Sequence, residues 1–157
     1  MIRRFVIKGL IRDGIIDREE WKAVNDEVRG CAYSLALHGE EMMQNARVSS
    51  LESSEVSNYF GDANYYYTRG KSQAQLWYNR VEAAIQEAPE RPFPWNRIFS
   101  VRDREESLAR LLARLPAARL TLIKAELDQQ IRMLDKCYAQ FEEDAWDATH
   151  PQELHGI

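Results

Sequence analysis

Apolar residues recur at steps of three and four positions along most of this chain, which is the period of α-helices that bury one face. The first long row consists of Trp21, Val24, Val28, Cys31, Leu35, His38 and Met42. Asp17 stands where an N-cap is needed, and Glu20 follows three residues later in the position that completes a capping box. The serine-rich residues 49–54 interrupt the row. The pattern therefore predicts a helix from about residue 18 to residue 47.

A second row keeps one helical phase over many turns. It consists of Val56, Phe60, Ala63, Tyr67, Gly70, Ala74, Trp77, Val81, Ala84 and Ala88. The unbroken phase across Gly70 predicts one long helix, or two helices stacked end to end. Pro89, Pro92 and Pro94 follow, and because proline cannot continue a helix they predict an extended connection.

The third row lies in the last part of the chain. It consists of Leu120, Ile123, Leu127, Ile131, Leu134, Tyr138, Phe141 and Ala145. We expect a helix here that ends at about Asp147. Pro116, which precedes this row, stops the helix before it, kinks that helix, or opens the last helix at its first turn. Shorter apolar rows predict two further helices, one at the N-terminus and one over about residues 103–115. The tail, residues 149–157, shows no period, and we expect it to be mobile.

No alternation typical of β-strands persists, so the predicted fold class is all-α, with three long helices and two short ones. The connectors are short, and consecutive long helices must therefore fold back on one another. We expect an elongated antiparallel bundle. The 157 residues are the size of one ordinary domain, which we place over residues 1–148.

The net charge of −4 makes nucleic acid an unfavourable partner, because phosphate binding needs clustered Lys and Arg. Arginines nevertheless concentrate in residues 91–119, while acidic residues concentrate in residues 13–27 and 126–147. Pairing between these segments inside the fold is the simplest explanation. A basic patch that binds an acidic ligand or RNA is the alternative.

The sequence also bears on the compartment. No apolar run approaches the ~20 residues of a membrane-spanning helix, and the first residues lack the long apolar stretch of a secretory signal. Cys31 and Cys137 both fall in helical apolar patterns, and the chain has no Asn-x-Ser/Thr site. We therefore expect two buried free thiols and a cytoplasmic protein with no membrane partner.

No residue pattern typical of an enzyme occurs, so we expect neither catalysis nor a bound cofactor or metal. Helical di-metal sites need Glu three residues before His on two helices, and no Glu precedes any of the three histidines at that spacing. Nucleophile elbows, Cys-x-x-Cys and phosphate-binding glycine loops are also missing from the sequence. His38 lies in an apolar row. A hydrogen-bonded histidine at the edge of the core explains it more simply than proton transfer or metal binding does.

Aromatic residues are the most unusual feature of the sequence. A helix cannot point Tyr65, Tyr66 and Tyr67 at one core, so Tyr65 or Tyr66 must lie at the rim or outside. Prolines and arginines flank Phe93 and Trp95, and Tyr, Trp and Arg are the residue types enriched at binding hot spots. The predicted protein-binding surface consists of Tyr65, Tyr66, Arg91, Phe93, Trp95 and Arg97. The alternative is that these aromatic side chains pack on their own bundle.

Size, charge and fold class together favour a non-catalytic protein that binds and regulates another protein, as inhibitors, immunity proteins and dedicated chaperones do. The identity of the partner protein is open, and so is self-association as a homodimer. One alternative is a self-assembling structural subunit of a phage or secretion-type assembly. Another is a nucleic-acid-associated accessory protein that uses the arginine-rich residues 91–119.

Overall fold

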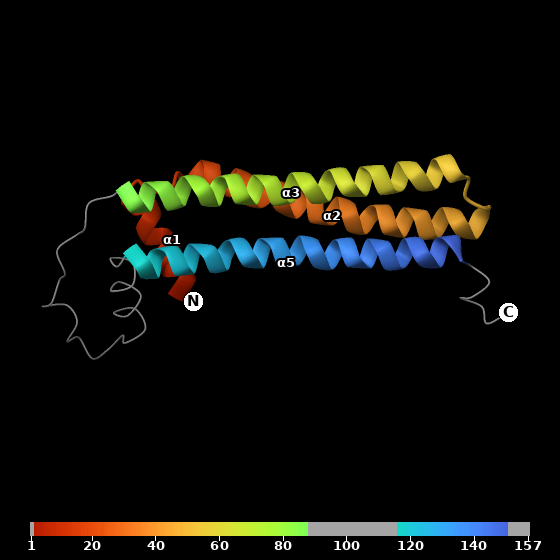
Figure 1. The fold of residues 1–157 in the computed structure, drawn as a ribbon. Coiled ribbons are helices and arrows are strands. Elements are labelled where there is room, and N and C mark those ends of the chain that lie inside the picture. Colours follow the sequence, from red (N-terminus) through yellow and green to blue (C-terminus); the bar gives the residue numbers. More distant parts are fainter. Residues whose placement is uncertain (1, 88–115, 151–157) are drawn as a thin grey trace, which may run out of the picture. The chain divides into compact units, whose positions relative to one another are not determined.

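The computed structural model describes residues 2–87 and 116–150, and every element in these ranges is a helix (Figure 1). Helix α1 spans Ile2–Arg12, α2 spans Arg18–Val48, α3 spans Ser53–Glu87 and α5 spans Pro116–Thr149. The all-α class is thereby confirmed, with three long helices and one short helix in the described residues. The second short helix, predicted over residues 103–115, and residues 151–157 of the predicted tail lie outside these residues. No helix in the described ranges is long and apolar enough to cross a membrane.

The connection between α1 and α2 follows from two residues. Gly14 has a φ of +78°, a left-handed conformation that glycine adopts without a steric penalty. Asp17 then caps α2, because its Oδ1 accepts hydrogen bonds from the backbone N–H groups of Glu19 at 2.9 Å and Glu20 at 3.4 Å. The N-cap predicted from the sequence is confirmed.

Contacts divide the chain into two compact units. The first unit consists of Met1–Val24 and Gln75–Gln129, and the second unit consists of Asn25–Ala74 and Gln130–Ile157. Each of the three long helices therefore contributes one stretch to each unit. The candidate functional surface lies wholly in the second unit.

The first unit buries apolar side chains from α1, from the turn after it and from the three long helices. They include Val6, Ile7, Leu10, Ile16, Val24, Trp77, Val81, Ile85, Ile123 and Leu127. An ion pair is buried with them: Arg119 Nη2 lies 3.2 Å from Asp13 Oδ2, and the two side chains are 6% and 9% exposed. Arg119 belongs to the arginine-rich segment and Asp13 to an acidic one, so internal pairing explains this arginine. Residues 91–115 of that segment lie outside the described residues.

The second unit packs α2, α3 and α5 around small and aliphatic side chains. Its buried apolar residues are Val28, Cys31, Ala32, Leu35, Met42, Ala63, Ala74, Leu134, Phe141, Ala145 and Ala148. Glu27 of α2 pairs with Arg69 of α3, whereas Asn45 pairs with Tyr59. Residue numbers that rise along α2 thus meet numbers that fall along α3, so these two stretches run in opposite directions. The contacts between α3 and α5 follow the same rule.

The buried face of α5 differs from the predicted row. Ile131 and Tyr138 are only half-buried, whereas the polar Gln130 is 6% exposed. The Nε2 of Gln130 donates a hydrogen bond to Asn25 Oδ1 at 2.5 Å. A buried amide is tolerated when such a partner is present. The face is therefore rotated toward Gln130, which a pattern of apolar residues alone does not reveal.

The two cysteines are free thiols in different surroundings. Cys31 is buried, as predicted, and burial raises the pKa of its thiol. Cys137 is only half-buried, so the prediction of two buried thiols is wrong for this residue. Cys137 lies on the flank of the α5 face that Leu134 and Phe141 define, and both of those side chains are fully buried.

Candidate protein-binding surface on helix α3

The three consecutive tyrosines of α3 point in different directions, as a rotation of about 100° per residue requires. Tyr66 is half-buried, and its ring meets the ring of His38 on α2 edge-on, with 5.4 Å between the centroids. Tyr67 lies against Tyr138 of α5, with 4.6 Å between the centroids. Tyr65 is 55% exposed. Of the two residues expected at the rim or outside, Tyr65 is the exposed one.

His38 is a hydrogen-bonded histidine at the edge of the core. Its Nδ1 lies 2.7 Å from the carbonyl oxygen of Ser34, and because a carbonyl can only accept, Nδ1 donates. The Nε2 lies 3.4 Å from Asp62 Oδ2 on α3. Both ring nitrogens thus face partners inside the second unit. Within the described residues, no group of three or more His, Cys, Asp and Glu side chains comes together as a metal site.

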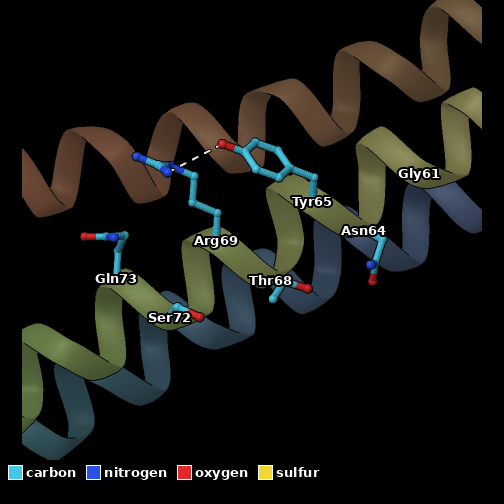
Figure 2. Close-up of a pocket in the computed structure, with 7 residues that line it drawn as sticks. All are labelled: Gly61, Asn64, Tyr65, Thr68, Arg69, Ser72 and Gln73. Atoms are coloured by element: carbon cyan, nitrogen blue, oxygen red, sulfur yellow. Dashed lines mark hydrogen bonds between the residues drawn. The ribbon is translucent and has the colours of Figure 1, made fainter.

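Tyr65 and Arg69 lie next to each other on α3, and their side chains border the candidate surface on the side of α2 (Figure 2). The Nη1 of Arg69 donates a hydrogen bond to the Tyr65 hydroxyl at 3.4 Å. The Nε of the same guanidinium pairs with the carboxylate of Glu27 on α2, and this hydrogen bond raises the pKa of Arg69. These two contacts limit the conformations that both exposed side chains sample. The pair is therefore partly preorganised for a partner.

A shallow, open recess of about 460 Å³ lies beside this pair. The described residues that line it all come from α3, and they are Gly61, Asn64, Tyr65, Thr68, Arg69, Ser72 and Gln73. Three of the residues that line the recess, Gly61, Thr68 and Ser72, have small side chains (Figure 2). A Cβ added at Gly61 would meet no atom within 4 Å. The floor of the recess is thus open to solvent.

The outward face of α3 in the second unit carries few charges. Its exposed uncharged members include Ser54, Ser57, Asn58, Gly61, Asn64, Tyr65, Thr68 and Ser72, and the exposed charged residues of α3 in this unit are Glu55, Asp62 and Arg69. The exposed residues of α2 and α5 in the same unit include more charges, of both signs, for example Asp26 and Arg29 on α2, and Lys136 and Glu143 on α5. A surface with few charges loses less hydration when a partner covers it. This face is hereafter called the α3 outer face.

The charged residues of α3 next to the recess are Asp62, Arg69 and Lys71, and each has a partner within the second unit. Asp62 faces His38 and Arg69 pairs with Glu27. The Nζ of Lys71 lies 4.8 Å from the centroid of the Tyr67 ring and 3.4 Å from its hydroxyl. A partner that covers the outer face therefore leaves these contacts in place.

Other exposed aromatic residues of the second unit lie in different surroundings. Tyr33 is 68% exposed on α2, on the side of that helix that also carries Asp26, Arg29 and Glu40. Trp146 of α5 stacks on His150, with 3.6 Å between the ring centroids, so one face of the indole is already covered. Tyr65 differs from both because it lies beside the recess on α3.

Of the six residues predicted as a protein-binding surface, one lies at this site. Tyr65 is exposed beside the recess, and Tyr66 packs on His38 instead. The other four, which are Arg91, Phe93, Trp95 and Arg97, lie outside the described residues. Sequence reasoning missed the small uncharged residues around Tyr65. The sequence could have identified them, because positions 61, 65, 68 and 72 follow helical spacing and none of the four residues is charged.

Comparison with protein-family models, with curated proteins and with solved structures finds no match for this chain.

Proposed function

We propose that this chain is a non-catalytic protein-binding domain, and that it holds a protein partner on the α3 outer face and thereby regulates that partner. The observation that carries the proposal is the exposed Tyr65 beside a recess of small residues on a helix face with few charges. Interface cores are depleted in charge and enriched in Tyr and Arg, and this face has that composition. The inhibitor, immunity-protein and chaperone-like roles are specific forms of this function.

The energetics of binding favour this face in two ways. Tyr65 buries a large ring when a partner covers it, and its contact with Arg69 lowers the entropy lost on ordering. Asn64, Thr68 and Ser72 offer hydrogen-bonding groups that can be matched without burying a charge. Arg69 is held by Glu27 at the edge of the recess. Its remaining N–H groups can donate hydrogen bonds to a partner at the polar rim of the interface.

The compartment belongs to the same proposal. Both cysteines are free thiols, and a protein with free thiols suits the reducing cytoplasm. The nucleic-acid alternative gains nothing from Arg119, the described arginine of the arginine-rich segment. Its guanidinium is buried and already engaged by Asp13, so it does not present a charge to phosphate.

The test is capture of partners from an extract of the native cells with the full chain as bait, followed by mass spectrometry and titration of the captured protein. Tyr65→Ala should weaken binding by more than ~2 kcal/mol, about 30-fold in Kd, because Tyr65 is the expected hot spot. Tyr33→Ala is the matched control, since it removes a tyrosine that is 68% exposed, against 55% for Tyr65, from the charged side of α2. Equal affinities of the Tyr65→Ala variant and the unaltered chain would refute the proposal.

A further inference from the structure

The ring of His38 on α2 lies between two hydrogen-bond acceptors. Its Nδ1 is 2.7 Å from the carbonyl oxygen of Ser34, one turn earlier on α2, and because a carbonyl can only accept, Nδ1 carries a proton. Its Nε2 is 3.4 Å from Oδ2 of Asp62 on α3. A neutral imidazole has a single N–H group, and here Nδ1 holds it. In the neutral ring, Nε2 is therefore an acceptor that faces another acceptor.

We propose that His38 and Asp62 form a pH-sensitive contact between α2 and α3, which becomes a charged hydrogen bond when Nε2 takes up a proton from water. Both ring nitrogens then donate, Nδ1 to the carbonyl of Ser34 and Nε2 to the carboxylate of Asp62. Loss of that proton removes the second bond and leaves a lone pair beside the carboxylate. Histidine side chains ordinarily change charge between about pH 5 and pH 8, so the contact responds to pH in this range.

Two tyrosines of α3 keep the ring in place. The ring of Tyr66 meets His38 with 5.4 Å between the centroids and an interplanar angle of 61°, and the ring of Tyr59 meets it with 6.1 Å and 84°. The His38 side chain is only 17% exposed. The imidazole therefore stays beside Asp62 in both protonation states, and the change lies in the hydrogen bond between them.

The charged groups near His38 are almost all acidic. Asp62 and the two tyrosines face the ring from α3, and on α5 the carboxylate of Asp144 lies against Gly39, the next residue of α2. Residues 38–62 and 140–149 contain a single basic residue, Arg47, and the acidic residues Glu40, Glu41, Glu52, Glu55, Asp62, Glu142, Glu143, Asp144 and Asp147. A proton on His38 therefore adds a positive charge to a strongly acidic part of the second unit.

The substitution Asp62→Asn tests the contact, because the amide is uncharged and can donate to the neutral Nε2. The Asp62 side chain is 64% exposed, so the substitution should leave the helices intact. Denaturant unfolding at about pH 8 and at about pH 5.5 measures the unfolding equilibrium constant on both sides of the ordinary range of histidine. At the higher pH, the Asp62→Asn variant should be at least as stable as the unaltered chain.

At the lower pH, the Asp62→Asn variant should be the less stable of the two, because it lacks the charged hydrogen bond. The ratio of the two unfolding constants should change by about threefold between the two pH values, since an exposed carboxylate limits the energy of the pair. Glu55→Gln is the matched control, because it removes the same charge from an exposed position of α3 in the same acidic part of the chain. Its effect should be equal at both pH values.

A second measurement tests the position of the proton directly. Nuclear magnetic resonance of the ring nitrogens, with the His38 signals identified by their loss in a His38→Gln variant, should show the neutral ring protonated on Nδ1. A neutral ring protonated on Nε2 overturns the inference, because Nε2 then donates to Asp62 without taking up a proton. Equal pH dependence of the Asp62→Asn and Glu55→Gln variants also overturns it. Neither outcome involves a partner, so the proposed function is tested separately.

Discussion

Gly70 of α3 and Leu134 of α5 meet where two helices of the second unit approach each other closely. A Cβ added at Gly70 would lie 2.9 Å from both Cδ atoms of Leu134 and 3.3 Å from the Cβ of Cys31. Gly70→Ala gains about 1 kcal/mol of helix propensity, but the new methyl group must displace Leu134, which costs ~1–3 kcal/mol of overpacking. We expect a net destabilisation of roughly 0–2 kcal/mol from these opposing effects.

Shortening Leu134 should remove the clash between its side chain and the methyl group of Gly70→Ala. Leu134 is fully buried, so Leu134→Ala should by itself cost ~2–5 kcal/mol, the range for opening a cavity in a packed core. In that background the methyl group of Gly70→Ala enters the vacated space and keeps its helix propensity. The same substitution should then stabilise by about 1 kcal/mol. The two changes should therefore couple by ~1–3 kcal/mol, as expected of residues in direct contact.

Denaturant unfolding of the unaltered chain, both single variants and the double variant measures this coupling. Gly30→Ala is the matched control, because Gly30 is an exposed helical glycine in α2 whose added Cβ would meet nothing within 4 Å. It should stabilise by ~0.5–1 kcal/mol, with or without Leu134. If Gly70→Ala stabilises the unaltered chain as much as Gly30→Ala does, the helices are not in close contact at this point and the reasoning is refuted.

Two measurements, an alkaline titration and a comparison of thiol reaction rates, test the surroundings of single side chains. A hydrogen bond to Glu82 raises the pKa of Tyr78 to about 12, so Tyr78 should ionise last in an alkaline absorbance titration, and Tyr78→Phe should remove that final step. Because this pKa is raised from 10.0, the stabilisation by the bond is complete below about pH 10 and disappears as the pH passes about 12. Burial raises the pKa of the Cys31 thiol, so Cys31 should react with a thiol reagent more slowly than the half-buried Cys137, and equal rates would contradict this.

The helices could be predicted from the sequence because each long one has an uninterrupted apolar row and a chemical stop. Asp17 shows this at the start of α2, where a capping side chain precedes the row. The buried face of α5 could be predicted only in part, since Gln130 and Arg119 are buried by partners 105 and 106 positions away in sequence. The spacing of apolar residues gives no information about polar pairs whose members are so far apart in the sequence.

The candidate surface shows the same division. Three adjacent tyrosines imply that one must leave the core, and the sequence alone predicts that much. Which tyrosine is exposed depends on which side of α3 packs against α2. On that side, the ring of Tyr66 packs against the ring of His38. The recess beside Tyr65 is a property of small side chains, which an analysis centred on aromatic residues overlooks.

The hydrogen-bonded amides inside the second unit connect its interior to this surface. The hydrogen bond from the buried Gln130 to the half-buried Asn25 contributes only about 1 kcal/mol of net stability. Its value is specificity, because the Nε2 of Gln130 meets the Oδ1 of Asn25 in one register of α5 against α2, while the buried Oε1 of Gln130 has no hydrogen-bond partner in the described residues. Leu134, one turn further along α5, then meets Gly70, which fixes the rotation of α3. A rotation of α3 by one residue, about 100°, would turn Tyr65 away from its present position, so the α3 outer face depends on these contacts in the core.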